Sequence, residues 1–164
     1  MTPESRATRK KFTLTRNDKP MDDLVKETDQ KTLAVWAVDC AERVMPFYEE
    51  IYPDDPRPRN AIKTLRAWID TGVFRMADIR RASLASHAAA REAGEDTAAR
   101  SAARAAGQAV ATAHVKTHSS GAALYAQQAI WRATSMDDAD AAVARERDWQ
   151  ERHLLRLRKN NDDQ

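Results

Sequence analysis

The stretch LAVWAVDCAERVMPFYEEIYPDDPRPRNA, residues Leu33–Ala61, decides the fold of this chain. Its first part repeats apolar residues at helical spacing, and additional apolar positions widen the stripe, so it predicts a helix covered by protein on most sides. We expect this central helix to kink at Pro46 and to end before Pro53 and Pro56. Pro58 then suits the first turn of the next helix. The stretch therefore predicts two long helices joined by a short rigid turn.

The rest of the chain carries helical signals and no sustained β-branched alternation. We expect a short helix after Pro20 and an N-cap at Asp29 for the central helix. The helix that Pro58 opens should stop at Gly72. Further helices are expected over about 76–93, over an alanine-rich segment to about Lys116, over about 120–134, and from 137 or 138 onward.

These elements predict an all-α fold, a compact single-domain bundle of six or seven helices. Alanine has the highest helix propensity, and alanine-rich faces let helices pack closely. The sequence places the following residues in or near the core: Trp36, Val44, Leu65, Trp68 and Ile130.

Composition indicates one domain with a surface of mixed sign. The 164 residues carry a formal charge of +2, with 27 cationic and 25 acidic side chains. We expect a disordered basic arm over 1–11, a helical domain over 12–158 and a frayed polar tail over 159–164. Arg100 and Arg104 interrupt the longest weakly polar run, which argues against a membrane span. No secretory signal is visible, so we expect a cytoplasmic protein.

Charged residues on and beside the central helix are the first candidates for function. Asp39 and Arg43 stand four residues apart and can pair directly. Arg57 and Arg59 follow the proline turn, from which they could fold back onto Asp39 or Glu42. Such a cluster is either a structural ion-pair network or a site for an anion or a partner's carboxylate, because arginine binds planar oxyanions in bidentate fashion.

Histidines and one neighbouring arginine form a second candidate group. His114 and His118 are four apart and should share a helix face, with His87 and Arg91 on a neighbouring helix. His87 could complete a trio of ligands, but no HExxH motif accompanies the pair and no third ligand is evident in sequence, so we expect no metal and no cofactor. Ser86 and Thr112 lack the surroundings of a catalytic nucleophile. Cys40, the only cysteine, lies among apolar residues and should be an inert part of the core.

Four segments together resemble the immunity protein five-like family of bacterial toxin–immunity systems. They are LAVWAVDCAERVMPFYEEIYP (33–53), DDPRPRNAIKTLRAWIDTG (54–72), RRASLASHAAAREAG (80–94) and ARAAGQAVATAHVKTHSSGAALYAQQAI (103–130). The resemblance covers roughly 12–132 and rests mainly on the W-A-x-D-C-A-E-R-V and R-P-R-x-A-I signatures. It implies an all-helical, non-enzymatic protein that binds and neutralises a cognate protein toxin. The matching polar positions are Asp39, Arg43, Arg57, Arg59, His87, Arg91, His114 and His118.

Other functions remain open at this point. The main alternative is a helical module that binds a small anionic ligand at the Arg/His cluster. Nucleic-acid binding through the basic arm and the last helix, and an unrecognised enzyme, are less favoured. The near-neutral charge argues against a polybasic nucleic-acid binder. We therefore expect a protein partner, and neither a membrane nor nucleic acid.

Overall fold

The computed structural model describes residues 11–14 and 18–164, and within them the chain forms seven helices and no strand. The predicted arm over 1–11 lies almost wholly outside the described residues. The all-α prediction is confirmed. The helices are α1 (Lys19–Lys26), α2 (Gln30–Glu49), α3 (Arg57–Thr71), α4 (Met76–Glu92), α5 (Ala98–Ala111), α6 (His118–Ala133) and α7 (Met136–Asp162).

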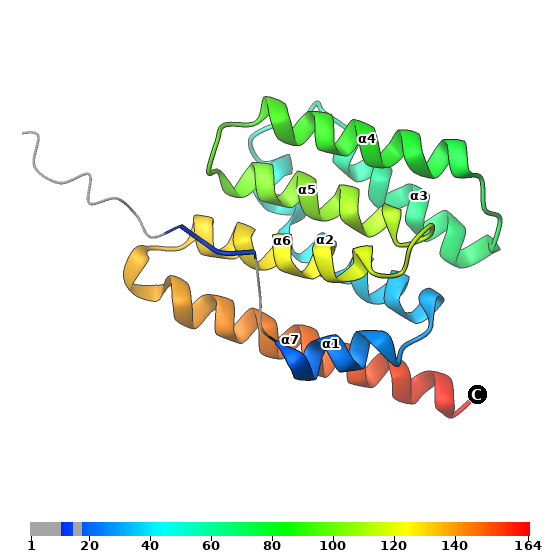
Figure 1. Cartoon of the computed structure of the whole chain (residues 1–164). Coiled ribbons are helices and arrows are strands. Elements are labelled where there is room, and N and C mark those ends of the chain that lie inside the picture. Colours follow the sequence, from blue (N-terminus) through cyan, green and yellow to red (C-terminus); the bar gives the residue numbers. More distant parts are fainter. Residues whose placement is uncertain (1–10, 15–17) are drawn as a thin grey trace, which may run out of the picture.

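The helices form a closely packed bundle around α2 and α5. Figure 1 shows α4, α5 and α6 side by side, with α2 and α3 behind them and α7 and α1 along the lower edge. α5 contacts α2, α3, α4 and α6, which explains why its sequence is almost entirely alanine on its inner faces. Within the described ranges, no helix is long and apolar enough to cross a membrane.

The central position predicted for α2 is confirmed. Leu33, Trp36, Val44 and Met45 are fully buried, and Tyr48 is almost so. The indole Nε1 of Trp36 donates to the carbonyl of Gln150 at 2.8 Å, so this large side chain is buried with its polar atom satisfied. The other predicted core residues also lie in the core or against it: Val44, Leu65, Trp68 and Ile130.

Most helix boundaries follow from local sequence signals. The Asp29 side chain accepts from the backbone N–H of Thr32 at 2.9 Å, as expected of an N-cap. α2 continues past Pro46 to Glu49. Gly72 ends α3 in the left-handed conformation, with φ of 68°, which glycine adopts without a steric penalty.

The alanine-rich helix ends earlier than its sequence predicted. α5 stops at Ala111 instead of near Lys116, because contacts from the α1–α2 end bind the carbonyls that follow. The Gln30 amide donates to the carbonyls of Thr112 and Ala113, both at 3.0 Å. The Lys116 ammonium reaches back to the carbonyl of Thr28 at 3.3 Å. These tertiary hydrogen bonds stabilise a turn that contains neither glycine nor proline.

Both ends of the described domain pack against the bundle. The ring of Phe12 lies 6.0 Å from that of Trp131, so the start of the described chain packs against α6. At the other end, α7 continues to Asp162, through most of the segment expected to fray, and Asn161 donates a hydrogen bond to Thr32.

Candidate functional site

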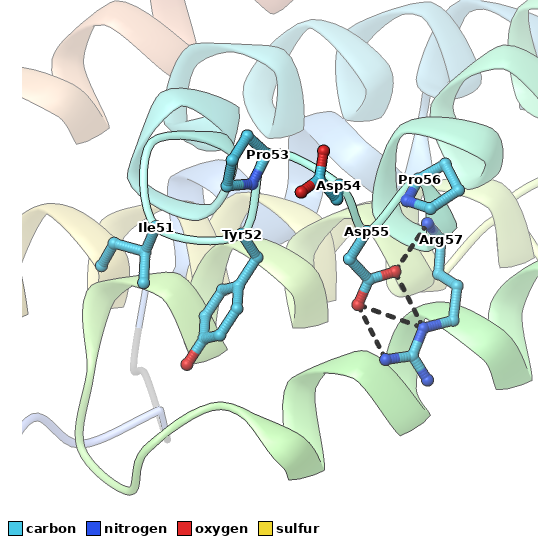
Figure 2. Close-up of a pocket in the computed structure, with 7 residues that line it drawn as sticks. All are labelled: Ile51, Tyr52, Pro53, Asp54, Asp55, Pro56 and Arg57. Carbon is cyan, nitrogen blue, oxygen red and sulfur yellow. Dashed lines mark hydrogen bonds and ion pairs between the residues drawn. The ribbon is translucent and has the colours of Figure 1, made fainter.

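The turn between α2 and α3 forms a hollow on the surface of the bundle. Residues 51–57 line an open hollow of about 540 Å³, which Figure 2 shows with the side chains of the turn around it. Ile51 is 63% exposed, and Pro53, Asp54 and Pro56 are exposed as well. The turn therefore presents apolar side chains and a carboxylate to solvent on a backbone that two prolines restrict.

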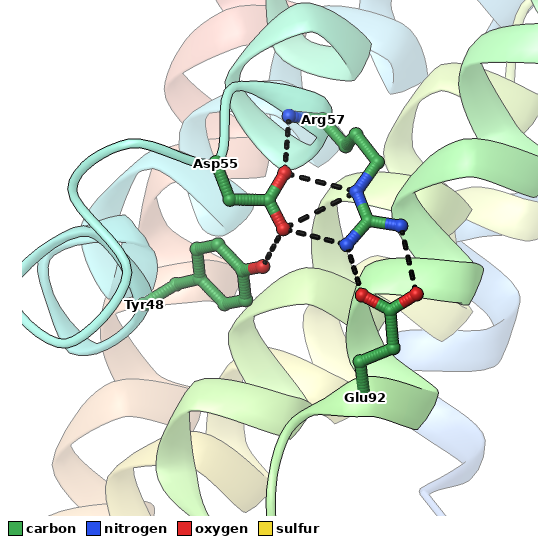
Figure 3. Close-up of polar contacts among 4 residues, drawn as sticks. All are labelled: Tyr48, Asp55, Arg57 and Glu92. Carbon is green, nitrogen blue, oxygen red and sulfur yellow. Dashed lines mark hydrogen bonds and ion pairs between the residues drawn. The ribbon is translucent and has the colours of Figure 1, made fainter.

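A network beneath the turn holds its backbone in place (Figure 3). The Asp55 carboxylate accepts from the backbone N–H of Arg57 at 3.1 Å and from the Tyr48 hydroxyl at 2.5 Å. The Arg57 guanidinium donates to the same carboxylate through Nε at 2.9 Å and Nη2 at 2.7 Å. Arg57 also binds Glu92 at the end of α4. The network thus connects α2, the turn, α3 and α4.

Electrostatics reinforce this network. The hydrogen bonds from Arg57 hold the pKa of Asp55 well below its usual range, although burial opposes the effect. Burial, together with the bond to Asp55, raises the pKa of Tyr48, so its hydroxyl stays protonated and donates. The bonds to Asp55 and then Glu92 raise the pKa of Arg57. Arg57 is therefore a permanently charged bridge between two carboxylates.

Arg59 is likewise paired with two carboxylates, one of which was expected. It donates to Glu42 at 2.5 Å and through Nε to Glu49 at 3.2 Å, and both acids lie on α2. The predicted contact between Arg59 and Glu42 is present, whereas Arg57 reaches neither Asp39 nor Glu42. Because both arginines are already neutralised, neither leaves a free guanidinium for a small anion.

Asp39 and Arg43 do not pair with each other, contrary to the expectation from their spacing. Asp39 contacts Nε2 of His153 on α7 at 2.7 Å and lies 3.7 Å from Arg66 on α3. Arg43 turns toward α7 instead, where Nε and Nη2 bind Glu146 at 2.8 and 2.9 Å. Each residue of the expected pair therefore anchors α7, and the i, i+4 contact is replaced by longer-range contacts.

The histidines are also arranged differently from the prediction. His114 lies in the α5–α6 turn and stacks on Phe74 with a centroid distance of 6.4 Å, whereas His118 is the first residue of α6. They do not share a helix face, because α5 ends before both of them. His118 Nδ1 contacts Gln108 at 2.8 Å, and burial lowers its pKa, as does His114 to a smaller degree.

His87 belongs to a different environment from the α2–α3 turn. Its Nδ1 lies 2.9 Å from Nη1 of Arg104 on α5, and burial, followed by the charges of Arg104, Arg91 and His118, lowers its pKa to about 4. The imidazole is therefore neutral at physiological pH, and its Nδ1 accepts a hydrogen bond from the Arg104 guanidinium. Arg91 lies one turn further along α4 and is exposed.

The eight predicted residues therefore fall into separate groups. Arg59 is linked through Glu42 and Arg66 to Asp39, while Arg57 belongs to the network under the turn. His87 and Arg91 lie on α4. In residues 11–14 and 18–164, no group of three or more His, Cys, Asp or Glu side chains could hold a metal ion.

The sequence did not reveal the carboxylates that pair with the predicted arginines, nor a buried pair of glutamine amides. Asp55 and Glu92 complete the network under the turn, and Glu146 is the buried partner of Arg43. Gln127 donates to Gln150 at 2.6 Å, and Gln150 donates to the carbonyl of Ala123 at 3.0 Å. Only Asp55 had a local signal, because the D-D-P-R-P-R run places it two residues before Arg57. The others come from elements far apart in the sequence.

Comparison with known proteins identifies one family. The family model described as "Imm-5 like putative immunity protein" matches residues 23–157, which include the whole of α2 to α6. No curated protein and no solved structure matches the chain.

Proposed function

Because the chain belongs to the Imm-5 like putative immunity protein family, we propose that it binds a bacterial toxin and neutralises it by non-covalent association, without catalysis. The match over residues 23–157 is the observation that carries this proposal, since it spans nearly the whole bundle and not one motif. On this proposal the protein acts in the cytoplasm of a bacterium, where it protects the cell from the cognate toxin.

The α2–α3 turn is the surface that we propose for toxin contact. Ile51 presents a large apolar side chain, 63% exposed, beside the exposed rings of Pro53 and Pro56. Exposed apolar side chains surrounded by polar ones are typical of protein-binding surfaces. Asp54 and Glu50 add exposed carboxylates at its edge. The matching toxin surface would have an apolar recess with cationic groups beside it.

The rigidity of the turn supports this assignment. Asp55 faces inward and binds Tyr48 and Arg57, whereas its neighbour Asp54 faces solvent. The backbone between Pro53 and Pro58 is therefore held before any partner arrives. Association then loses less conformational entropy than it would with a mobile loop, so the same contacts give a higher affinity.

Neutralisation can be tested in cells. The chain is co-expressed with candidate toxins taken from the genes adjacent to its own, and survival is compared with that of cells that carry each toxin alone. We expect survival to be restored and the two proteins to co-purify as a stable complex. Toxin that remains lethal, with no complex formed, would reject the proposed function. A protected cell without a complex would reject the binding mechanism.

A further inference from the structure

The solvent-facing side of α5 carries two arginines and a glutamine in one row. Arg100, Arg104 and Gln108 recur every four residues and face outward between α4 and α6, while the rest of the helix is mostly buried alanine. Residues 97–136 contain no aspartate and no glutamate. This stripe, which we call the α5 stripe, therefore brings positive charge to a face that lacks acidic residues on its own helix and on α6.

Hydrogen bonds between α4 and α5 define which residues of the two helices face each other. The Ser83 hydroxyl donates to the carbonyl of Gly107 at 3.0 Å, and the Ser86 hydroxyl to that of Ala103 at 2.8 Å. The helices are therefore antiparallel. The contact of His87 with Arg104 continues the same register, which places Arg91 level with Arg100 one turn further along.

α6 adds a phenol to the other side of the α5 stripe. Ser101 donates to Gln128 at 2.8 Å, and Gln108 contacts His118, so α5 and α6 also run antiparallel. This register places Tyr125 level with Arg104. Figure 1 shows α4, α5 and α6 adjacent to one another on this face.

Two of the three acidic residues nearest to these arginines in sequence are paired elsewhere. Glu92 pairs with Arg57 beneath the α2–α3 turn, and Asp96 pairs with Arg132 at the end of α6. Glu95 lies in the exposed α4–α5 connection. Among the described residues, no ion pair involves Arg91, Arg100 or Arg104, and the side-chain partner of Arg104 is the neutral ring of His87.

Burial, together with the positive charges around Arg104, lowers the pKa values of Arg104 and of His87. Burial lowers the pKa of Arg104, and the charges of Arg100 and Arg91 lower it further, while Tyr125 acts in the opposite direction. A negative charge placed among these groups would relieve the mutual repulsion of the guanidinium groups. It would also favour protonation of His87, which faces Arg104, Arg91 and His118.

We propose that Arg91, Arg100 and Arg104 form a binding site for a multivalent oxyanion, a ligand that carries phosphate groups or several carboxylates. Residues four apart on a helix lie about 6 Å apart along its axis, a spacing that lets adjacent guanidinium groups hold oxygens of one such ligand. His87 orients Arg104, and the Tyr125 hydroxyl can donate a hydrogen bond to the anion. This site is separate from the α2–α3 turn and does not depend on toxin binding.

The test uses the full chain at low ionic strength, titrated with pyrophosphate and, separately, with citrate by calorimetry. We expect one saturable site. Arg104→Gln and Arg100→Gln should each weaken binding by at least about tenfold, because each removes charge-assisted hydrogen bonds. Arg104→Lys keeps the charge but loses the planar guanidinium that donates two parallel hydrogen bonds, so it should have an intermediate affinity. Arg145→Gln, on an exposed part of α7, makes the same change in net charge and should leave the affinity unchanged.

A second readout reports on the site directly. Saturation with the anion should raise the pKa of His87, followed by NMR of its ring protons, and far-UV spectra should show that every variant is folded. Binding of pyrophosphate alone would identify a phosphate ligand, and binding of citrate alone a polycarboxylate; both support the site. No saturable binding of either anion would overturn the proposal. Equal losses of affinity for the anion in Arg145→Gln and Arg104→Gln would also overturn it, as would a pKa of His87 that does not change on saturation.

Discussion

Arg43 on α2 binds Glu146 on α7 through two nitrogens, at 2.8 and 2.9 Å, while its guanidinium carbon lies 3.9 Å above the ring of Trp149. The two partners differ in burial, since the side chain of Glu146 is 4% exposed and that of Arg43 is 42% exposed. The arginine therefore covers and neutralises a carboxylate that has little access to water. Because of this asymmetry, removing Arg43 and removing the Glu146 carboxylate should cost different amounts of stability.

Arg43→Met should destabilise the protein by about 3 kcal/mol, because it leaves the buried Glu146 charge without its partner. Glu146→Gln should cost less, about 1 kcal/mol, because the amide oxygen keeps one hydrogen bond from Arg43 and no unpaired charge stays buried. Urea unfolding of the two variants and of the double variant at neutral pH measures both values and their coupling. Equal costs for the two single changes would show that Glu146 is better solvated than its burial indicates.

Asp55→Asn should lower the free energy of unfolding by about 2 kcal/mol at neutral pH, since the amide cannot accept the bidentate bond of Arg57. The pKa of Asp55 in the folded state is below its ordinary value of 3.8, so its contribution is present above pH 3.8 and lost as the pH falls through the lower folded value. The difference in the free energy of unfolding between variant and wild type should therefore shrink below pH 3.8. Asp54→Asn, the exposed neighbour, serves as the control and should be neutral. A pH-independent difference would contradict this account.

Gly107→Ala should destabilise the protein by about 1–2 kcal/mol, although alanine is the better helix former. A methyl group at Gly107 would lie 2.7 Å from Nε2 of His87, whose ring is held by Arg104. In a His87→Ala background the clash is removed, so the same change should stabilise by about 1 kcal/mol. Thermal unfolding of the wild type, the two single variants and the double variant shows whether the effect of Gly107→Ala on stability changes sign when His87 is absent. A stabilising Gly107→Ala in the wild type would mean that His87 is not held in this position.

The parts of the fold that were predictable from sequence are those that depend on local signals. The apolar stripe of α2 predicts its burial, Asp29 its beginning, and Gly72 the end of α3. The end of α5 was not predictable, because a distant group, Gln30, binds the carbonyls of Thr112 and Ala113 that follow it, and Lys116 in turn donates to the carbonyl of Thr28. Local propensity there favoured continuation of the helix, and tertiary hydrogen bonds overrode it.

The candidate site shows the same division. The D-D-P-R-P-R run marked the turn, and the pairing of Arg59 with Glu42 followed from the proximity of adjacent helices. The partners of Arg43 and Asp39 were missed because Glu146 and His153 lie on α7, more than a hundred residues away. One sequence shows which charges need partners, but it does not show which distant helix supplies them.

The contact between the α2–α3 turn and the toxin is tested by the affinity of the purified chain for its purified cognate toxin, compared between two matched variants. Ile51→Asp places a charge on the α2–α3 turn, and Leu155→Asp makes the same change at an exposed position on α7. If the turn is the contact surface, Ile51→Asp should weaken binding by at least about 30-fold, as expected of a central apolar anchor, while Leu155→Asp binds as the wild type does. Undiminished binding by a folded Ile51→Asp protein would contradict the assignment of the turn.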